Sequence, residues 1–351
     1  MIGKKEIYLK AYFRKNVGDD LFVRCLAERY PHVSFKICTY PAFAQVFARF
    51  PNIRNIGKAG LFIDRASNKI TGKHIYRMQM EKSAPAVVHI GGSIFIEPYQ
   101  FSLLNPNTFV IGCSFGPYKT EAYRSAVFSE LEKAKDVCFR DRYSYEMFSS
   151  LDHVRMAPDV LFGYPGYPAV QKGCGVGISV MSIDKRPELK HVADKYYNEI
   201  AQTLDECARR QIPVKLFSFC EAEGDAEAIR EIMARSKTKR AEVCEYDGDM
   251  DAILEQLNEC EYIVASRFHA MVIGWCLSKK VFPVVYSNKQ LNVMQDVGYR
   301  GSYWDLKNTE ADSELCLMEH IMAACTVDVK EYQQHAQQQF EVLDRYISEF
   351  A

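Results

Sequence analysis

One imidazole and two permanent cations follow apolar runs within the stretch YIVASRFHAMVIGWCLSKKVFPVVYSNK, residues 262–289. The imidazole belongs to His269, and the cations are Arg267 and Lys289. An imidazole with a reference pKa of about 6.5 can transfer a proton near neutral pH. Guanidinium and ammonium groups bind carboxylates and phosphates. These residue types predict a site for an anionic substrate that needs a proton.

The hydrophobic pattern of this stretch predicts a β-α-β unit. Residues 262–266 are a short apolar run typical of a buried strand, 268–277 are apolar all round and predict a buried helix, and 281–287 predict a second strand. Strands joined in this way run parallel. The guanidinium and the imidazole then lie where the first strand meets the helix, and the ammonium group lies just past the second strand. All three are expected at the carboxyl edge of one sheet, where open α/β sheets bind ligands.

The stretch contains no acidic residue that could pair with its two cations. No Asp or Glu occurs from residue 262 to residue 295, so nothing local neutralises Arg267 or Lys289. A buried arginine without a partner is energetically expensive. The partner comes either from another segment or from the substrate, and we favour the substrate.

Polar and glycine residues also follow two predicted strands in the first half of the chain. The strand 6–13 leads into a turn with Asn16, Gly18 and Asp19, which can present backbone amides to a ligand or cap the next helix. The strand 86–90 is followed by Gly91-Gly92-Ser93, where the absence of Cβ atoms permits close approach of a ligand or of another backbone. Ordinary tight turns use the same residues, so both interpretations stay open.

Arg140 is a further cation at the predicted end of a strand, 137–139. The adjacent Asp141 can pair with it or cap the helix that follows, on which we place Ser144. A structural and a ligand-binding role for Arg140 are therefore both open.

The whole chain predicts an α/β protein with two Rossmann-like lobes and a central cleft. Its 351 residues, 48% hydrophobic and 25% charged, suffice for two cores. Two α/β series are joined by a Gly- and Pro-rich linker at 162–168. We predict an N-terminal α/β domain over 1–165, a C-terminal α/β domain over 166–327 that carries the SRFHA segment, and a C-terminal helix over 328–351 that packs back across the linker. Residues 58–82 are polar, and we expect them to be irregular, with helix only near their end.

Composition excludes several classes of function. A formal net charge of -1 gives no global basic field, so no nucleic-acid partner is expected. The 12 cysteines form no CxxC pair and show no zinc-site spacing, so no metal is expected. The N-terminus lacks the apolar core of a signal peptide, and no run reaches the roughly 18 apolar residues of a membrane span. We expect a soluble protein of the cytoplasm with reduced thiols.

Seven short segments taken together resemble the polysaccharide pyruvyltransferase family. In chain order they are NVGDD (16–20), GGSIF (91–95), GCSFGP (112–117), FRDRYS (139–144), APDV (157–160), SRFHA (266–270) and YSNK (286–289). The resemblance implies a GT-B-like fold and transfer of a pyruvyl group from phosphoenolpyruvate to a sugar of a polysaccharide or its precursor. The product carries pyruvate as a cyclic ketal, and no cofactor is needed beyond the donor.

The resemblance also assigns roles to residues of this sequence. By the family's pattern, Arg140, Arg267 and Lys289 match donor-binding cations, and His269 matches the general acid. The remaining substrate-binding residues that it implies are Asn16, Gly18, Asp19, Gly91, Gly92, Ser93 and Ser266. The partners implied are phosphoenolpyruvate, a sugar or lipid-linked saccharide acceptor and, through that acceptor, a peripheral contact with the membrane. Ser93 stands where related sequences often carry a third glycine, which leaves the backbone path of this turn open.

Two other functions fit the same predicted fold. A GT-B glycosyltransferase would use a nucleotide sugar, but the chain after His269 has no Glu to hold a ribose diol before Glu310. A catalytically silent sugar-binding protein is the second alternative. The presence of His269 together with all three cations argues against it.

Overall fold

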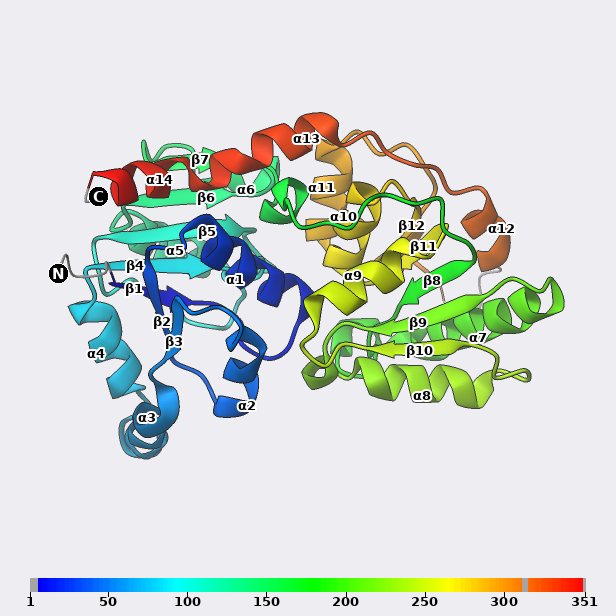
Figure 1. The fold of residues 1–351 in the computed structure, drawn as a ribbon, viewed down its shortest axis with the longest axis horizontal. Helices are drawn as coiled ribbons and strands as arrows, with labels where there is room; N and C mark the ends of the chain where they lie inside the picture. The colour runs from blue at the N-terminus through cyan, green and yellow to red at the C-terminus, as the bar shows by residue number, and fades with distance from the viewer. Residues whose placement is uncertain (1–5, 311–314, 350–351) are drawn as a thin grey trace. The chain divides into compact units, whose positions relative to one another are not determined.

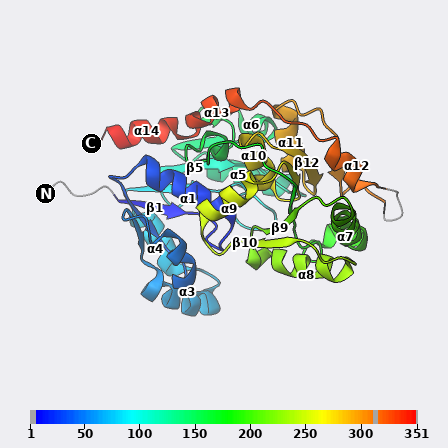
Figure 2. The same ribbon diagram turned by 45° about the vertical axis from the view of Figure 1, so that its right-hand side comes forward.

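The computed structural model describes residues 6–310 and 315–349, which form two α/β units (Figures 1 and 2). The described residues 6–13, 19–163 and 334–349 form the N-terminal unit, and 14–18, 164–310 and 315–333 form the C-terminal unit. Residues 1–5, 311–314 and 350–351, which fall within the three predicted domains, lie outside the described residues. The division between the units falls between Gly163 and Tyr164, inside the predicted linker.

The N-terminal unit is built on a parallel sheet with strand order β3-β2-β1-β4-β5-β6-β7. Its strands are β1 (Glu6–Lys10), β2 (Ser34–Ile37), β3 (Ile53–Asn55), β4 (Ala86–Ile90), β5 (Thr108–Cys113), β6 (Asp136–Phe139) and β7 (Val154–Met156). The strand order reverses between β1 and β4, so the ligand crevice of a doubly wound sheet is expected there.

The helices of this unit include one, α3 (Gly57–Thr71), that the sequence analysis did not predict. They are α1 (Val17–Arg29), α2 (Pro41–Ala44), α3 (Gly57–Thr71), α4 (Ile75–Ser83), α5 (Glu121–Leu131), α6 (Arg142–Phe148) and α14 (Glu341–Ser348). The helix expected near the end of 58–82 is confirmed as α4, but the expectation that the rest of this segment is irregular is wrong, because α3 forms a helical hairpin with α4. The outer surface of α3 keeps large apolar residues such as Phe62 and Ile70 exposed, so this helix lacks the uniformly polar side of most surface helices.

The C-terminal unit repeats the same topology. Its parallel sheet has the order β10-β9-β8-β11-β12-β13, built from β8 (Val176–Ser179), β9 (Val214–Ser218), β10 (Glu242–Glu245), β11 (Tyr262–Ala265), β12 (Lys280–Val285) and β13 (Trp304–Asp305). The predicted β-α-β unit is confirmed, because β11 and β12 are parallel neighbours joined by α10 (Phe268–Cys276). The strand order reverses between β8 and β11, where the SRFHA segment begins.

The other helices of the second half are α7 (Ala193–Arg209), α8 (Asp225–Arg235), α9 (Met250–Asn258), α11 (Asn288–Asp296), α12 (Leu317–Met322) and α13 (Lys330–His335). Among the described residues, no helix combines the length and the apolar character needed to cross a membrane.

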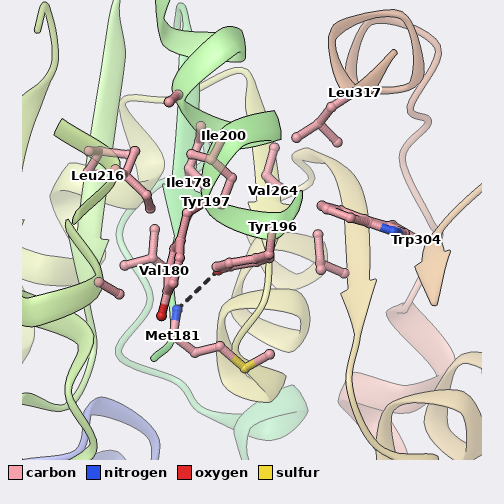
Figure 3. Packing of buried hydrophobic residues seen from close by; sticks show 14 of the residues in the cluster. Ile178, Val180, Met181, Tyr196, Tyr197, Ile200, Leu216, Val264, Trp304 and Leu317 are labelled. Carbon is pink, nitrogen blue, oxygen red and sulfur yellow. Dashed lines mark hydrogen bonds between the residues drawn. The ribbon is translucent and has the colours of Figure 1, made fainter. Parts of the chain in front are cut away.

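Tyr196 of α7 links the core of this unit to its functional edge. Its ring is fully buried among apolar side chains of the cluster drawn in Figure 3, and it stacks against Trp304 at 6.0 Å between ring centroids. The phenol oxygen accepts a hydrogen bond from the Met181 amide (3.2 Å) and donates one to Ser266 Oγ (2.9 Å). This hydrogen bond therefore connects the turn after β11 to the hydrophobic core of the unit.

Gln339 ties the C-terminal segment to the sheet of the N-terminal unit. Its side chain is fully buried; Oε1 accepts from the Gly112 amide (2.9 Å), and Nε2 donates to the carbonyls of Ala157 (2.7 Å) and Pro158 (3.1 Å). The amide thus satisfies backbone groups that would otherwise be buried without partners.

We expect Gln339→Ala to destabilise the protein by about 1–3 kcal/mol, because it leaves buried backbone groups without hydrogen bonds. The adjacent Gln338 is exposed and gives the matched control. Denaturant unfolding should show a lower midpoint for Gln339→Ala than for Gln338→Ala. Equal midpoints would show that the buried amide is not what anchors this segment.

Candidate functional site

Three strands of the C-terminal sheet, β9, β11 and β12, are followed by charged or titratable residues. Glu223 and Asp225 follow β9, Arg267 and His269 follow β11, and Lys289 follows β12. Because parallel strands end at the same edge, these side chains share one edge of one sheet. The structure therefore brings together the three residues that the sequence placed at this edge and adds two carboxylates.

Backbone hydrogen bonds fix the turn between β11 and α10 at the strand-order reversal. The Ser266 amide donates to the Ser179 carbonyl (3.2 Å), and the Arg267 amide donates to Ser179 Oγ (3.2 Å). Ser266 is fully buried and its hydroxyl accepts from Tyr196. This contact gives Ser266 a positioning role, while its predicted contact with substrate stays a prediction.

Arg267 has carboxylate partners from another segment, so the preference for the substrate as its partner is wrong. Its Nε donates to Asp225 Oδ2 (3.1 Å), Nη2 donates to the other oxygen of Asp225, and Nη1 donates to Glu223. The Arg267 side chain is only 7% exposed, and Asp225 is fully buried. A guanidinium has five N–H donors, so this pairing leaves two for another ligand.

The two carboxylates lie in FCEAEGD, residues 219–225, directly after β9. Asp225 Oδ2 also accepts from the amides of Phe219 and Cys220, both at 3.0 Å, which fixes the path of this loop. Burial raises the pKa of the Glu223 carboxyl, but the charges of Arg267, Arg186 and Lys289 outweigh burial and bring it down to about 2. The sequence contains a signal for this loop, because the acidic residues directly follow the apolar run at 214–219 in the same half of the chain as the SRFHA segment.

Arg186 adds a further cation to this edge, and the ring of Tyr286 lies against both Arg186 and Lys289; the sequence analysis assigned neither Arg186 nor Tyr286 to the site. The Arg186 guanidinium lies 4.9 Å and the Lys289 ammonium lies 5.5 Å from the centroid of the Tyr286 ring. Burial raises the pKa of the Tyr286 phenol, but Lys289, Arg186 and Arg267 together lower it below its ordinary value. Arg186 also donates to Glu223 (3.4 Å).

His269 packs against the segment 14–18, which groups with the C-terminal unit. A Cβ atom added to Gly18 would overlap the imidazole ring, so the ring occupies space that only glycine leaves open. The segment is held by the Val17 amide, which donates to the Phe219 carbonyl (3.1 Å), and by Asn16 Oδ1, which accepts from the Gly18 amide (3.1 Å). The structure thus places Gly18 against His269, and the contacts of Asn16 and Gly18 with a substrate stay predictions.

The helices α10 and α11 begin at the same edge without a side-chain cap. Neither Arg267, the N-cap of α10, nor Ser287, the N-cap of α11, makes a capping hydrogen bond with its side chain. The Ser287 hydroxyl oxygen is buried and has no hydrogen-bond partner. Helix N-termini carry partial positive charge and favour anions, so both add to the attraction of Lys289 and Arg186.

Arg140 belongs to the N-terminal unit and is buried with a partner there. Its Nη1 donates to Asp159 Oδ2 (2.8 Å), and Nε donates to Ser114 Oγ (2.8 Å). Of the two side chains, Arg140 is 1% exposed and Asp159 is 0% exposed. Asp141 instead caps α6 by accepting from the Ser144 amide (2.9 Å), so the cap is the role that the structure assigns to it.

The Gly91-Gly92-Ser93 turn follows β4 at the strand-order reversal of the N-terminal sheet. A Cβ atom on Gly92 would lie 2.5 Å from Arg140 Nη1, and one on Gly91 would lie 3.7 Å from Asp19 Oδ1. Gly92 therefore leaves room for the guanidinium, and this packing explains why a glycine occupies the position without any contact with a ligand. Ser93 is exposed. The contacts of Arg140, Asp19 and this turn with a donor stay predictions.

The fold defines the class of protein. Three solved structures share it over nearly the whole chain, although their low identities establish likeness of fold only. Anabaena Alr3699/HepE in complex with UDP-glucose has 11% identity and a TM-score of 0.55, with 98% of each chain covered. A putative UDP-N-acetylglucosamine 2-epimerase from Listeria monocytogenes has 8% identity and a TM-score of 0.53, with 99% of this chain and 97% of that one covered. UDP-GlcNAc 2-epimerase from Neisseria meningitidis, bound to UDP-GlcNAc, has 9% identity and a TM-score of 0.51, with 98% and 100% covered. The protein is a two-lobed α/β protein of the GT-B type.

The sequence then defines the family within that class. A family model described as "Polysaccharide pyruvyl transferase" matches residues 16–288, from the NVGDD turn through the YSN residues before Lys289. The chain belongs to this family. Comparison with curated proteins found no match.

The low pKa of Glu223 predicts a specific loss of stability in acid. Because the folded-state pKa of about 2 lies below the ordinary value of 4.5, the ion pair stabilises the fold above pH 4.5. This contribution is lost as the pH falls from 4.5 to 2. Between these two pH values, we expect the unfolding free energy of the wild type to fall by about 3 kcal/mol more than that of Glu223→Gln.

Denaturant unfolding at a series of pH values measures this difference. Glu255→Gln on α9, an exposed position, is the matched control and should keep the wild-type slope. If Glu223→Gln keeps that slope too, the carboxylate is not held by the surrounding cations.

Proposed function

We propose that this protein transfers a pyruvyl group from phosphoenolpyruvate to two hydroxyls of a sugar, with His269 as the general acid. One observation carries the proposal: an imidazole that Gly18 admits lies at the same sheet edge as Arg186, Arg267 and Lys289. Family membership supports it independently. The acceptor in this proposal is a sugar or a lipid-linked saccharide, and the scheme needs no cofactor beyond the donor.

The charges at this edge suit a donor that has both a carboxylate and a phosphate. Glu223 and Asp225 offset much of the charge of Arg267, so Lys289, Arg186 and the N-termini of α10 and α11 supply most of the attraction for an anion. The two remaining N–H groups of Arg267 can donate to the donor in a geometry that the carboxylates fix in advance. Arg140 enters the proposal as a further donor contact only on the family's pattern.

The chemistry balances with these groups. His269 gives its proton to the methylene carbon of phosphoenolpyruvate while a sugar hydroxyl attacks the adjacent enol carbon, and the imidazole regains a proton from that hydroxyl. The bond between this carbon and the phosphate oxygen then breaks, the second hydroxyl attacks the same carbon, and its proton leaves with the phosphate. The products are a cyclic ketal with a new methyl group and hydrogen phosphate. Lys289 and Arg186 stabilise the charge of the departing phosphate.

Transfer of a sugar from a nucleotide sugar is the competing function, because solved structures of the same fold contain UDP-glucose or UDP-GlcNAc. Those ligands belong to proteins 11% and 9% identical to this chain. The chain lacks a Glu between His269 and Glu310 that would hold a ribose diol. A direct binding comparison decides between the two donors.

We expect phosphoenolpyruvate to raise the thermal unfolding temperature, because it binds only the folded state. Lys289→Ala should weaken its affinity about ten- to a hundredfold, since a hydrogen bond to a charged group contributes about 1.5–3 kcal/mol. The exposed Lys330 on α13 gives the control variant Lys330→Ala. The measurement is a thermal-shift titration with phosphoenolpyruvate, UDP-glucose and UDP-GlcNAc. Stabilisation by a UDP-sugar and none by phosphoenolpyruvate would contradict pyruvyl transfer and favour glycosyl transfer as the function.

We expect His269→Gln to fold, to bind phosphoenolpyruvate and to turn over about 10²–10⁴-fold more slowly, because an amide cannot deliver a proton to carbon. The wild-type rate should fall as the pH rises past the pKa of the imidazole. Phosphate release in the presence of a panel of saccharides measures both effects, and His191→Gln, at an exposed position, is the control. A near-normal rate for folded His269→Gln would make this histidine structural.

A further inference from the structure

A second surface of the protein, on the helical hairpin α3–α4 of the N-terminal unit, has no role in the transfer site. Four large apolar side chains are exposed on it: Phe62 by 79%, Ile63 by 48%, Ile70 by 82% and Ile75 by 49%. Scattered single apolar residues on a surface need no explanation, but a cluster on one short hairpin marks a contact surface. We call these four residues the apolar face of the hairpin.

Helix geometry places the residues of α3 in two adjacent sectors. At 3.6 residues per turn, Phe62, Ile63 and Ile70 fall within an arc of about 100°. The exposed cations Arg65 and Lys69 fall in the sector directly beside it. An apolar sector flanked by basic side chains is the pattern of helices that lie in the interface of an anionic membrane.

The surrounding chain carries an unusual excess of positive charge. From residue 29 to residue 96 there are ten Lys or Arg residues and only two acidic ones, Asp64 and Glu81. Both acidic side chains are buried and paired, Asp64 with Arg77 (3.1 Å) and Glu81 with Lys10 (2.9 Å). Residues 29–96 therefore contribute no exposed carboxylate of their own, and two of their cations pair with carboxylates outside the segment, Arg29 with Asp344 and Lys36 with Glu6.

The buried Asp64 also joins the two helices of the hairpin by hydrogen bonds. Asp64 of α3 accepts hydrogen bonds from the amides of Tyr76 (2.8 Å) and Arg77 (3.3 Å) at the start of α4. Tyr76 donates to the Ile56 carbonyl (3.2 Å) and closes the hairpin from its inner side. Figures 1 and 2 show α3 and α4 next to each other at the margin of this unit. The polar contacts lie inside the hairpin, which leaves its outer face apolar and basic.

We propose that this hairpin is a docking surface for an anionic lipid membrane. Phe62, Ile63 and Ile70 insert between headgroups, and Arg65, Lys69 and Lys73 contact lipid phosphates. The exposed apolar side chains favour a bilayer over other polyanions, which would need only the cations. Such docking would bring a lipid-linked acceptor to the enzyme, but it does not depend on the transfer reaction, and its failure would leave the proposed function unchanged.

Co-sedimentation of the full chain with lipid vesicles tests the proposal. We expect binding to phosphatidylcholine vesicles that contain about 30% phosphatidylglycerol, weaker binding at about 500 mM salt, and at least about tenfold weaker binding to pure phosphatidylcholine, on the order expected for several basic residues at an anionic surface. The variants Phe62→Ser/Ile70→Ser and Lys69→Glu/Lys73→Glu should each lower the affinity about tenfold or more. All four positions are exposed, so the fold should be unaffected.

The chain offers a matched control on the other unit. Val170, which is 56% exposed, and the exposed Lys172 allow Val170→Ser/Lys172→Glu, which should bind vesicles like the wild type. A second readout is the variant Phe62→Trp, whose indole fluorescence should shift to shorter wavelength when anionic vesicles are added. Equal binding to neutral and anionic vesicles, wild-type binding by Phe62→Ser/Ile70→Ser, or an unchanged indole emission from Phe62→Trp would each overturn the proposal.

Discussion

The candidate site depends on the buried ion pairs of Arg267 with Asp225 and Glu223. They join the turn after β11 to the loop after β9, and Asp225 fixes that loop through two backbone amides. Removing one partner of such a group leaves a buried charge uncompensated, which costs about 3–5 kcal/mol. The geometry of the sheet edge is therefore set before any ligand binds. An anionic donor of the proposed kind would meet an arginine that is already oriented, with Lys289 and Arg186 supplying most of the positive charge that the carboxylates do not offset.

The N-terminal unit also has a buried arginine at the end of a strand, paired with a carboxylate from another segment. Arg140 follows a strand of a parallel sheet, it is buried, and its carboxylate partner Asp159 comes from beyond the next strand. In both units a glycine leaves space for a side chain that follows a strand: Gly92 for the Arg140 guanidinium, and Gly18 for the His269 imidazole. In each unit the side chain at a strand end is thus packed against a glycine from another segment.

Local sequence was sufficient for most of the two sheets, because buried parallel strands are short apolar runs that the sequence displays directly. It also placed Arg267, His269 and Lys289 at one sheet edge, because the β-α-β pattern alone determines that. The partners of Arg267 could not be assigned in this way, since Glu223 and Asp225 meet it only through the pairing of β9, β8 and β11. The helix α3 was missed for a different reason: it keeps large exposed apolar residues such as Phe62 and Ile70, so it lacks the uniformly polar side by which a surface helix is recognised.

The central claim is that His269 acts as an acid from a position that Gly18 makes available. Turnover of Gly18→Ala tests this claim most directly, because a methyl group on residue 18 must displace the imidazole while the charged groups of the site stay in place. The backbone of Gly18 lies in the first turn of α1, where alanine is well tolerated, so the variant should fold. The account predicts near-normal binding of phosphoenolpyruvate and a rate at least about a hundredfold lower, as for loss of a general acid. A Gly18→Ala protein with the wild-type rate would contradict it.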